Sequence, residues 1–276
     1  MLSGRPEAGR WVSSGMDVWE RGDSYEKYVG RWSRRVAPLF LAWLRVPAGR
    51  RWLDLGCGTG AVCTAIAELC APSSLVGVEP SEGFLATARR LLADRATVLR
   101  GSAAEIPLED SAVEVVVSGL VLNFVADPRA AVAEMSRVTE NGGRIGAYVW
   151  DYAGRMELMR LFWDTALELD PGAASLDEGT RFPLCRPRAL GELFSGAGLQ
   201  QVEAAPIDIP TRFGSFDEYW EPFLGGQGPA PAYALSLDQA ARERMRERLR
   251  ASIPRQPDGS IHLTARAWAV QGTVAK

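Results

Sequence analysis

Histidine and cysteine are scarce in this sequence, which contains one histidine and four cysteines. His262 is the single histidine, and none of the cysteines forms a C-x-x-C pair. We therefore expect neither a Ser-His-Asp nor a Cys-His catalytic arrangement, and no metal site. His262 lies at the start of an alternating apolar segment, 261–270, so we interpret it as an ordinary residue of the last strand.

Long apolar runs are absent as well, because no segment approaches the ~20 residues that a membrane-spanning helix needs. Residues 1–15 mix glycine, serine and arginine with little apolar character, so no signal peptide is expected. These absences predict a cytoplasmic protein that does not bind membranes.

The charge balance does not favour a nucleic-acid-binding protein. The net charge is −3, and the 31 basic residues are spread along the chain. The one dense basic group, residues 242–250, has interleaved glutamates and an apolar pair, Met245 and Leu249, at helical spacing. This pattern predicts an exposed helix with a narrow packing stripe rather than a nucleic-acid surface.

Residues 52–60 read Trp-Leu-Asp-Leu-Gly-Cys-Gly-Thr-Gly and are the most informative segment of the chain. The apolar start predicts a buried strand, and the glycines allow a tight turn close to a ligand. Apolar residues recur at helical spacing from Ala61 onward. We therefore expect backbone N–H groups of the turn to face a ligand at the N-terminus of a helix.

The glycines alone leave two kinds of ligand open. Gly56, Gly58 and Ala61 also satisfy the dinucleotide pattern G-x-G-x-x-G/A. Asp54, two residues before the first glycine, is the first residue that discriminates between them, because a carboxylate is unfavourable beside a pyrophosphate. A carboxylate at this position suits a cationic ligand.

The string Asp54-x-Gly56-x-Gly58-x-Gly60 resembles motif I of the class I S-adenosylmethionine-dependent methyltransferases. The resemblance implies that Asp54 helps to orient the amino-acid end of S-adenosylmethionine. It also implies that the loop of Gly56, Cys57, Gly58 and Gly60 lies under this cofactor. At Cys57 we expect the backbone N–H, rather than the sulfur, to matter.

A second predicted strand, 74–78, ends in Glu79, and Pro80 then leads into a helix. A carboxylate at the end of a strand, about twenty residues past a glycine loop, is placed to accept both hydroxyls of a ribose. We therefore predict that Glu79 and Pro80 contact the cofactor. Glu79 suits NAD and S-adenosylmethionine equally well.

Residues 101–108 resemble the family's G-D-A-x-x-L-P-F segment, whose acid accepts from the adenine amino group. Ser102 replaces the acid here, so we expect Ser102 and Ala103 to bind adenine with reduced strength. The valine-rich run 112–118 predicts a central parallel strand. It ends in Ser118, a further predicted cofactor contact, and the resemblance spans residues 50–151 in order.

The N-terminal region resembles a subgroup of bacterial small-molecule methyltransferases of type 11. Tyr28 and Arg31 lie in its Tyr-x-x-Tyr-x-x-Arg-Trp-Ser-Arg segment. In that family the corresponding residues close on the carboxylate of the cofactor, which implies the same role for Tyr28 and Arg31.

Asp151 and Asn123 are the candidate catalytic residues. Methylation of a neutral hydroxyl often needs a base, and Asp151 follows a core strand at the sheet edge where ligands bind. Asn123 is the second candidate, as an orienting group. A helix N-cap for Asp151 and a loop hydrogen bond for Asn123 are equally compatible with the sequence.

The resemblance implies an α/β fold, a doubly wound, mostly parallel seven-stranded sheet with a helical cap, in one domain over 1–276. We assign about 36–151, 196–208 and 261–273 to the core, and the other segments to the cap: 1–35, 152–195 and 209–260. The aromatic residues of the cap either contact a ligand or pack the cap onto the core: Phe213, Phe216, Tyr219, Trp220 and Phe223.

The predicted activity is methyl transfer from S-adenosylmethionine to a small, apolar or aromatic molecule. Two alternatives stay open: an NAD-dependent oxidoreductase, and a relative that binds S-adenosylmethionine without methylating. The sequence does not specify the acceptor, the atom methylated or the oligomeric state.

Overall fold

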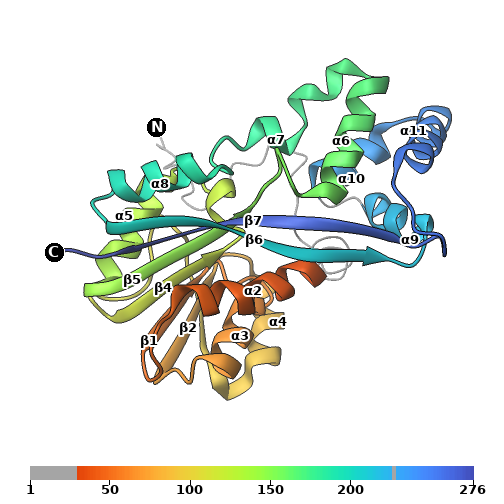
Figure 1. The fold of residues 1–276 in the computed structure, drawn as a ribbon. Coiled ribbons are helices and arrows are strands. Elements are labelled where there is room, and N and C mark those ends of the chain that lie inside the picture. Colours follow the sequence, from red (N-terminus) through yellow and green to blue (C-terminus); the bar gives the residue numbers. More distant parts are fainter. Residues whose placement is uncertain (1–29, 226–227) are drawn as a thin grey trace, which may run out of the picture.

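The computed structural model describes residues 30–225 and 228–276. In these ranges, seven strands form one sheet in the order β3-β2-β1-β4-β5-β7-β6 (Figure 1). β7 is antiparallel to β5 and β6, and the other neighbours are parallel. The strands are β1 (Arg51–Leu55), β2 (Ser74–Glu79), β3 (Thr97–Arg100), β4 (Val113–Gly119), β5 (Thr139–Trp150), β6 (Gln200–Phe213) and β7 (Ile261–Thr273). The predicted sheet is confirmed.

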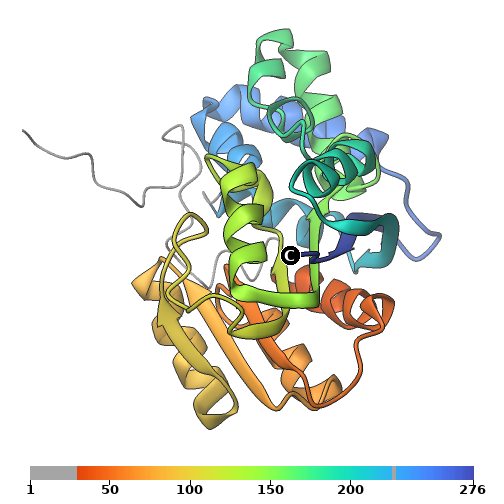
Figure 2. The ribbon, with the colours of Figure 1, turned by 90° about the vertical axis from the view of Figure 1, so that its left-hand side faces the viewer.

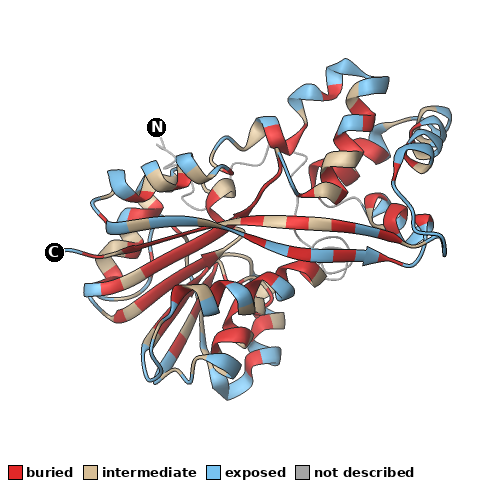
Figure 3. Ribbon diagram, viewed as in Figure 1, coloured by how far each residue is buried: buried red, intermediate tan, exposed pale blue. Residues whose placement is uncertain are grey.

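The valine-rich strand β4 lies at the centre of the parallel part, between β1 and β5. Val115, Val116 and Val117 are all buried, as both faces of a central parallel strand are covered by helices. Figure 3 shows this burial along the middle strands. The helices on the two faces are α2 (Arg31–Leu44), α3 (Ala61–Leu69), α4 (Glu82–Leu92), α5 (Pro128–Val138) and α8 (Pro187–Gly196).

Figure 2 shows α5 and α8 above the sheet and α2, α3 and α4 below it. Short 3-10 turns connect several elements: η2 (Ala93–Arg95), η3 (Leu122–Phe124), η4 (Pro171–Ser175) and η5 (Glu221–Leu224). Since the parallel strands share one direction, the loops after β1, β2, β4 and β5 lie along one edge of the sheet.

A helical cap extends beyond the ends of β6 and β7 (Figure 1). It contains α6 (Glu157–Leu169), α7 (Glu178–Arg181), α9 (Phe216–Trp220), α10 (Pro229–Ser236) and α11 (Gln239–Ser252). α11 packs on α6 through Met245 and Leu249, its two buried residues, so the predicted packing stripe is confirmed. None of the helices in the described residues is both long and apolar enough to span a bilayer.

The aromatic residues of the cap form its interior. Phe223 stacks on Phe162 with ring centroids 4.5 Å apart, and the Tyr219 hydroxyl donates to the Leu158 carbonyl at 2.8 Å. The five aromatic residues singled out in the sequence, Phe213 to Phe223, are at most 4% exposed. Of the two expected roles, the structure supports packing.

The boundary between core and cap differs from the expected division. That division placed 152–195 in the cap, whereas α8 packs on β6 and β7 of the sheet. The expected division also ended the core segment 196–208 at residue 208, but β6 continues to Phe213. The apolar residues of α8 face the sheet, which a sequence pattern does not distinguish from packing in a cap.

Candidate functional site

The glycine turn lies between β1 and α3, as predicted. Gly56, Gly58 and Gly60 have φ angles of +74°, +54° and +96°, a left-handed region that glycine adopts without strain. A Cβ on Gly56 would overlap the side chain of Val121 from the loop after β4. A Cβ on Gly58 would meet no atom within 4 Å, so the space beside Gly58 is open.

The N–H groups of the turn bind protein atoms rather than facing outward. Gly56 and Cys57 both donate to the Val78 carbonyl, at 2.7 and 3.0 Å. Gly58 donates to Oε2 of Glu79 at 3.1 Å. At Gly56, Cys57 and Gly58 the N–H groups are therefore bound by the end of β2 rather than directed at a ligand. The cofactor contact of Cys57 stays a prediction.

Asp54 is 1% exposed and lies at the end of β1. Its Oδ2 accepts from the backbone N–H of Cys63 at 3.1 Å, while Oδ1 is buried without a hydrogen-bond partner. Burial raises the pKa of Asp54 to about 7, with a smaller contribution from the charge of Glu79. A carboxylate in this state is stabilised by a cation.

Glu79 ends β2 and accepts from two backbone N–H groups. Oε1 accepts from Ser81 at 3.0 Å and Oε2 from Gly58 at 3.1 Å. Burial raises the pKa of Glu79, against the effect of these two bonds. Each oxygen keeps a further lone pair, so the carboxylate can still accept the hydroxyls of a ribose. Pro80, the next residue, is half-buried.

The loop after β3 forms a small turn at the same edge. Ser102 and Glu105 exchange backbone hydrogen bonds of 3.4 and 3.3 Å, and Ala103 is 5% exposed. Glu134 of α5 accepts from the N–H of Ile106 at 3.0 Å, which fixes the turn to this helix. Ser102 is half-buried at the position where the resemblance implies adenine.

Ser118 is fully buried, and its hydroxyl donates to the Leu55 carbonyl at 2.9 Å. This bond joins β4 to β1 below the glycine turn. The Ser118 hydroxyl thus stabilises the contact between the two strands, and its predicted contact to the cofactor stays a prediction.

Arg31 begins α2 at the edge of the cap. Its Nη1 donates to Oε1 of Glu218 at 3.1 Å, and its guanidinium lies over the rings of Trp32 and Phe213. Nε and Nη2 of Arg31 are buried and make no hydrogen bond. Tyr28, its predicted neighbour at the cofactor, lies outside the described residues.

Asn123 lies in η3, directly after β4. Both atoms of its side-chain amide are buried without a hydrogen-bond partner. Buried amide groups are almost always paired, so this one is available to a bound molecule. The loop hydrogen bond that the sequence also allowed is not formed.

Asp151 follows β5 and is 7% exposed. Its Oδ2 accepts from the N–H of Arg155 at 2.9 Å, and its carbonyl accepts from Gly154 and Met156. The carboxylate therefore stabilises the turn before α6. This is close to the structural alternative, an N-cap, that the sequence left open.

An aromatic group connects the loops that contain these two residues. The ring of Phe182, after α7, lies 5.1 Å from Phe124 and 5.5 Å from Tyr152, measured between centroids. Phe124 follows Asn123, and Tyr152 follows Asp151. The sequence offered no signal for Phe182, because it stands in a loop and its partners are about 30 and 60 residues away.

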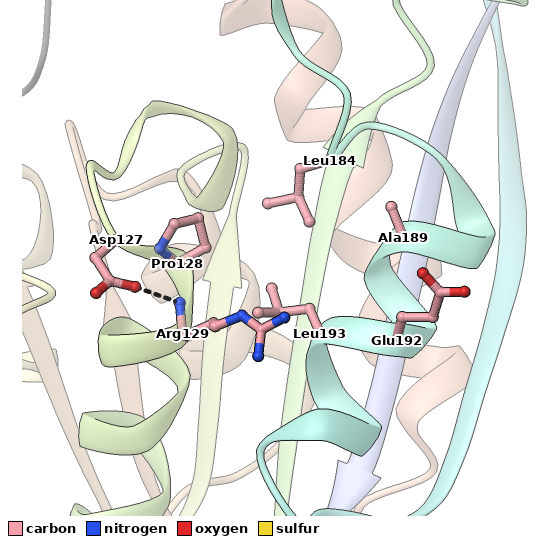
Figure 4. A pocket seen from close by; sticks show the side chains of 7 residues that line it. All are labelled: Asp127, Pro128, Arg129, Leu184, Ala189, Glu192 and Leu193. Atoms are coloured by element: carbon pink, nitrogen blue, oxygen red, sulfur yellow. Dashed lines mark hydrogen bonds between the residues drawn. The ribbon is translucent and has the colours of Figure 1, made fainter.

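A groove of about 350 Å³ lies between α5 and α8 (Figure 4). The side chain of Arg129 extends across it toward Leu193, and Pro128 and Leu184 form apolar walls. The lining residues are Asp127, Pro128, Arg129, Leu184, Ala189, Glu192 and Leu193.

Comparisons with known proteins agree with this geometry. A family model described as a methyltransferase domain matches residues 53–147, from β1 into β5. An uncharacterised methyltransferase of Mycobacterium tuberculosis is 37% identical over 131 residues, which are 46% of this chain and 52% of that protein. A demethylmenaquinone methyltransferase of Clavibacter sepedonicus is 36% identical over 115 residues, which are 41% of this chain and 43% of that protein.

The chain thus spans about half the length of the curated relatives that it matches. A solved structure, a putative methyltransferase from an antibiotic biosynthesis pathway of Anabaena variabilis, has a TM-score of 0.58 and 21% identity. The match covers 85% of this chain and 96% of that one, which shows a common fold. Residues 53–147 thus match a methyltransferase domain, and the sheet order is that of a solved methyltransferase fold. Together with the glycine turn, these matches support a class I S-adenosylmethionine-dependent methyltransferase.

Proposed function

We propose that this protein transfers the methyl group of S-adenosylmethionine to a small apolar or aromatic molecule. The observation that supports this most is the pair of buried carboxylates beside the glycine turn, Asp54 and Glu79. Asp54 has an unpartnered oxygen and a pKa raised to about 7, so its charged form gains most from a cationic ligand. S-adenosylmethionine carries a sulfonium and an ammonium group.

Asp54 disfavours NAD, whereas Glu79 suits the ribose of either cofactor. A pyrophosphate at this turn would bring two negative charges next to the buried Asp54 and would lack the N–H groups that phosphate-binding loops provide. The N–H groups of Gly56, Cys57 and Gly58 already donate hydrogen bonds to Val78 and Glu79.

The residues of the chain fit the parts of S-adenosylmethionine as follows. Asp54 serves the amino-acid end, Glu79 the ribose, and the turn of Ser102 and Ala103 the adenine. The open space beside Gly58 allows close approach of the cofactor to the backbone. Arg31 provides two buried N–H groups for the carboxylate of the cofactor.

Positioning can account for most of the catalysis. The bound cofactor supplies a methyl group on a sulfonium, which is already a good leaving group. Holding an acceptor in line with that bond can contribute as much as ~7 to 11 kcal/mol. Asn123, whose amide is buried and unpaired, is the residue that orients the acceptor. Asp151 stabilises the turn that places Tyr152 beside Phe182 and is the base if the acceptor needs one.

The acceptor site is formed by the loops after β4 and β5 together with the segment after α7. Phe124, Phe182 and Tyr152 give this site an aromatic wall, which favours a flat or apolar acceptor. The partner of the protein is thus a small molecule, and the predicted cytoplasmic location fits a soluble cofactor.

A methyl-transfer assay tests this function. The purified protein is incubated with S-adenosylmethionine and panels of phenols, quinols, aromatic amines and aliphatic acids, and S-adenosylhomocysteine is measured by mass spectrometry. We expect release that depends on an aromatic acceptor and is lost in Asp54→Asn with Glu79→Gln. Tight binding of S-adenosylmethionine with no release for any panel would favour a non-methylating relative.

A further inference from the structure

The unpaired atoms of Arg31 belong to one side of its guanidinium. Nε and Nη2 are adjacent and present two parallel N–H bonds, the geometry that binds both oxygens of a carboxylate. Both atoms are buried without a partner. The opposite nitrogen, Nη1, donates to Glu218 at 3.1 Å. Arg31 is thus already paired with one carboxylate, and its unpaired Nε–Nη2 edge indicates that it binds a second anion.

The ring contacts place this edge at the cofactor side of the sheet. The Arg31 guanidinium lies 4.4 Å from the ring centroid of Trp32 and 5.1 Å from that of Phe213. Phe213 is the last residue of β6, which runs in the same direction as β1. Arg31 therefore lies at the carboxyl end of the parallel strands, the end at which the glycine turn follows β1.

Glu218 connects Arg31 to the cap. Its Oε2 accepts from the N–H of Gly214 at 2.7 Å, and its own N–H donates to Oγ of Ser215 at 3.2 Å. This arrangement caps α9 and fixes the carboxylate. The Gly214 bond, and after it the charge and hydrogen bond of Arg31, keep the pKa of Glu218 low. Glu218 thus stays ionised next to Arg31.

We propose that Glu218 is a positioning residue for the cofactor. It holds Nη1 of Arg31, so that the Nε–Nη2 edge faces the carboxylate of the cofactor's amino-acid part, and it thereby links α9 of the cap to cofactor binding. This inference rests on the proposed function, since it takes S-adenosylmethionine or its product as the ligand.

The test compares two ligands that differ in the group Arg31 would bind. S-adenosylhomocysteine has the amino-acid carboxylate, whereas 5′-methylthioadenosine has the same adenosine and lacks the amino acid. Affinities for both are measured by calorimetry for the wild type, Glu218→Gln and Arg31→Lys. Glutamine can still accept from Gly214, so the cap of α9 is kept while the ion pair is lost.

We expect Glu218→Gln to weaken S-adenosylhomocysteine binding about fivefold, because an ion pair of this exposure is worth about 1 kcal/mol or less. Arg31→Lys keeps the charge but loses the bidentate edge, and should weaken the same ligand about tenfold or more. Binding of 5′-methylthioadenosine should stay within about twofold of the wild type in both variants. The control is Glu192→Gln, which removes the exposed Arg188–Glu192 pair of α8 and should change neither affinity.

Equal losses for both ligands would show a merely structural role and overturn the proposal, as would unchanged S-adenosylhomocysteine binding in both variants. If the wild type binds 5′-methylthioadenosine but not S-adenosylhomocysteine, Arg31 does not face a carboxylate. This result would overturn the role of Glu218 without contradicting the proposed function. Failure of the wild type to bind either ligand would instead contradict the proposed function.

Discussion

Glu79 accepts a hydrogen bond from the N–H of Gly58 at 3.1 Å, so the residue expected at the ribose also holds the glycine turn. Its second oxygen accepts from Ser81 at the start of α4. One carboxylate therefore joins the end of β2, the turn after β1 and the next helix. Loss of Glu79 should affect the shape of the turn and the contact to the ribose together.

Substitution of Glu79 should separate these two contributions. Glu79→Gln keeps one acceptor oxygen and should weaken S-adenosylhomocysteine binding about tenfold, since a hydrogen bond to a charged group is worth about 1.5 to 3 kcal/mol. Glu79→Ala removes both acceptors and should weaken it about a hundredfold. Calorimetric titration of both variants measures the effect, and equal affinity in Glu79→Ala and the wild type would remove Glu79 from the site.

The affinity for the cofactor should depend on pH through Asp54. Its pKa is raised to about 7 by burial, and a cationic ligand favours the ionised form. Affinity for S-adenosylhomocysteine should therefore rise as pH increases toward about 7 and level off above it. Between pH 6 and pH 8 the ionised fraction of Asp54 rises about tenfold, and the affinity should rise by the same factor.

Asp54→Asn is the matched variant for this pH profile. The variant should bind S-adenosylhomocysteine more weakly at pH 8, and its affinity should rise less between pH 6 and pH 8. The rise that remains is due to Glu79. A profile as steep as that of the wild type would assign the pH dependence to another group.

Gly56 and Gly58 should respond differently to alanine. In Gly56→Ala the new Cβ overlaps Val121, and such overpacking costs about 1 to 3 kcal/mol in addition to the strain of a positive φ. In Gly58→Ala the Cβ meets no protein atom, so stability should fall by only about 1 to 2 kcal/mol. Cofactor binding should fall sharply in Gly58→Ala, because the methyl group occupies the open space.

Urea unfolding and calorimetry on the same samples distinguish the two glycines. Val121→Ala should restore part of the stability of Gly56→Ala by removing the overlap. Full cofactor affinity in Gly58→Ala would mean that the ligand does not approach this glycine.

Glu178 should make the protein less stable as the pH rises. Burial raises its pKa to about 7 from an ordinary value of 4.5, despite the hydrogen bond from the indole of Trp163. Because burial favours the protonated form of Glu178, its contribution to the free energy of unfolding is complete below about pH 4.5. This contribution is lost as the pH rises through about 7. The loss is at most about 3 kcal/mol.

Glu178→Gln removes this titration and keeps an oxygen for Trp163. The free energy of unfolding of the variant, relative to the wild type, should be higher at pH 8 than at pH 5 by about 1 to 3 kcal/mol. A difference that does not change between these pH values would show that Glu178 does not titrate in this range.

Much of the core could be predicted because its signals are local in the sequence. The strand 51–55, the glycine turn and the following helix are neighbours along the chain, and the valine-rich run of β4 indicates burial on both faces. The hydrogen-bond partners of the Cys57 N–H and the Ser118 hydroxyl were not predictable in this way. Whether their polar groups face a ligand depends on Val78 and Leu55, which reach them only in the folded sheet.

The acceptor side was the least predictable part. Phe182 meets Phe124 and Tyr152 only in the folded chain, because the three residues belong to different loops. Arg31 and Glu218 form a pair across 187 residues. The aromatic residues of the cap have the same composition whether they contact a ligand or pack against each other, so only the structure distinguishes the two roles.

Calorimetric titration with S-adenosylmethionine, S-adenosylhomocysteine and NAD in parallel tests the central claim most directly. Asp54 and Glu79 at the glycine turn predict micromolar binding of the first two ligands, and Asp54 predicts no heat with NAD. Binding of NAD with no response to S-adenosylmethionine would contradict the account, because the buried Asp54 would then have to lie beside a pyrophosphate.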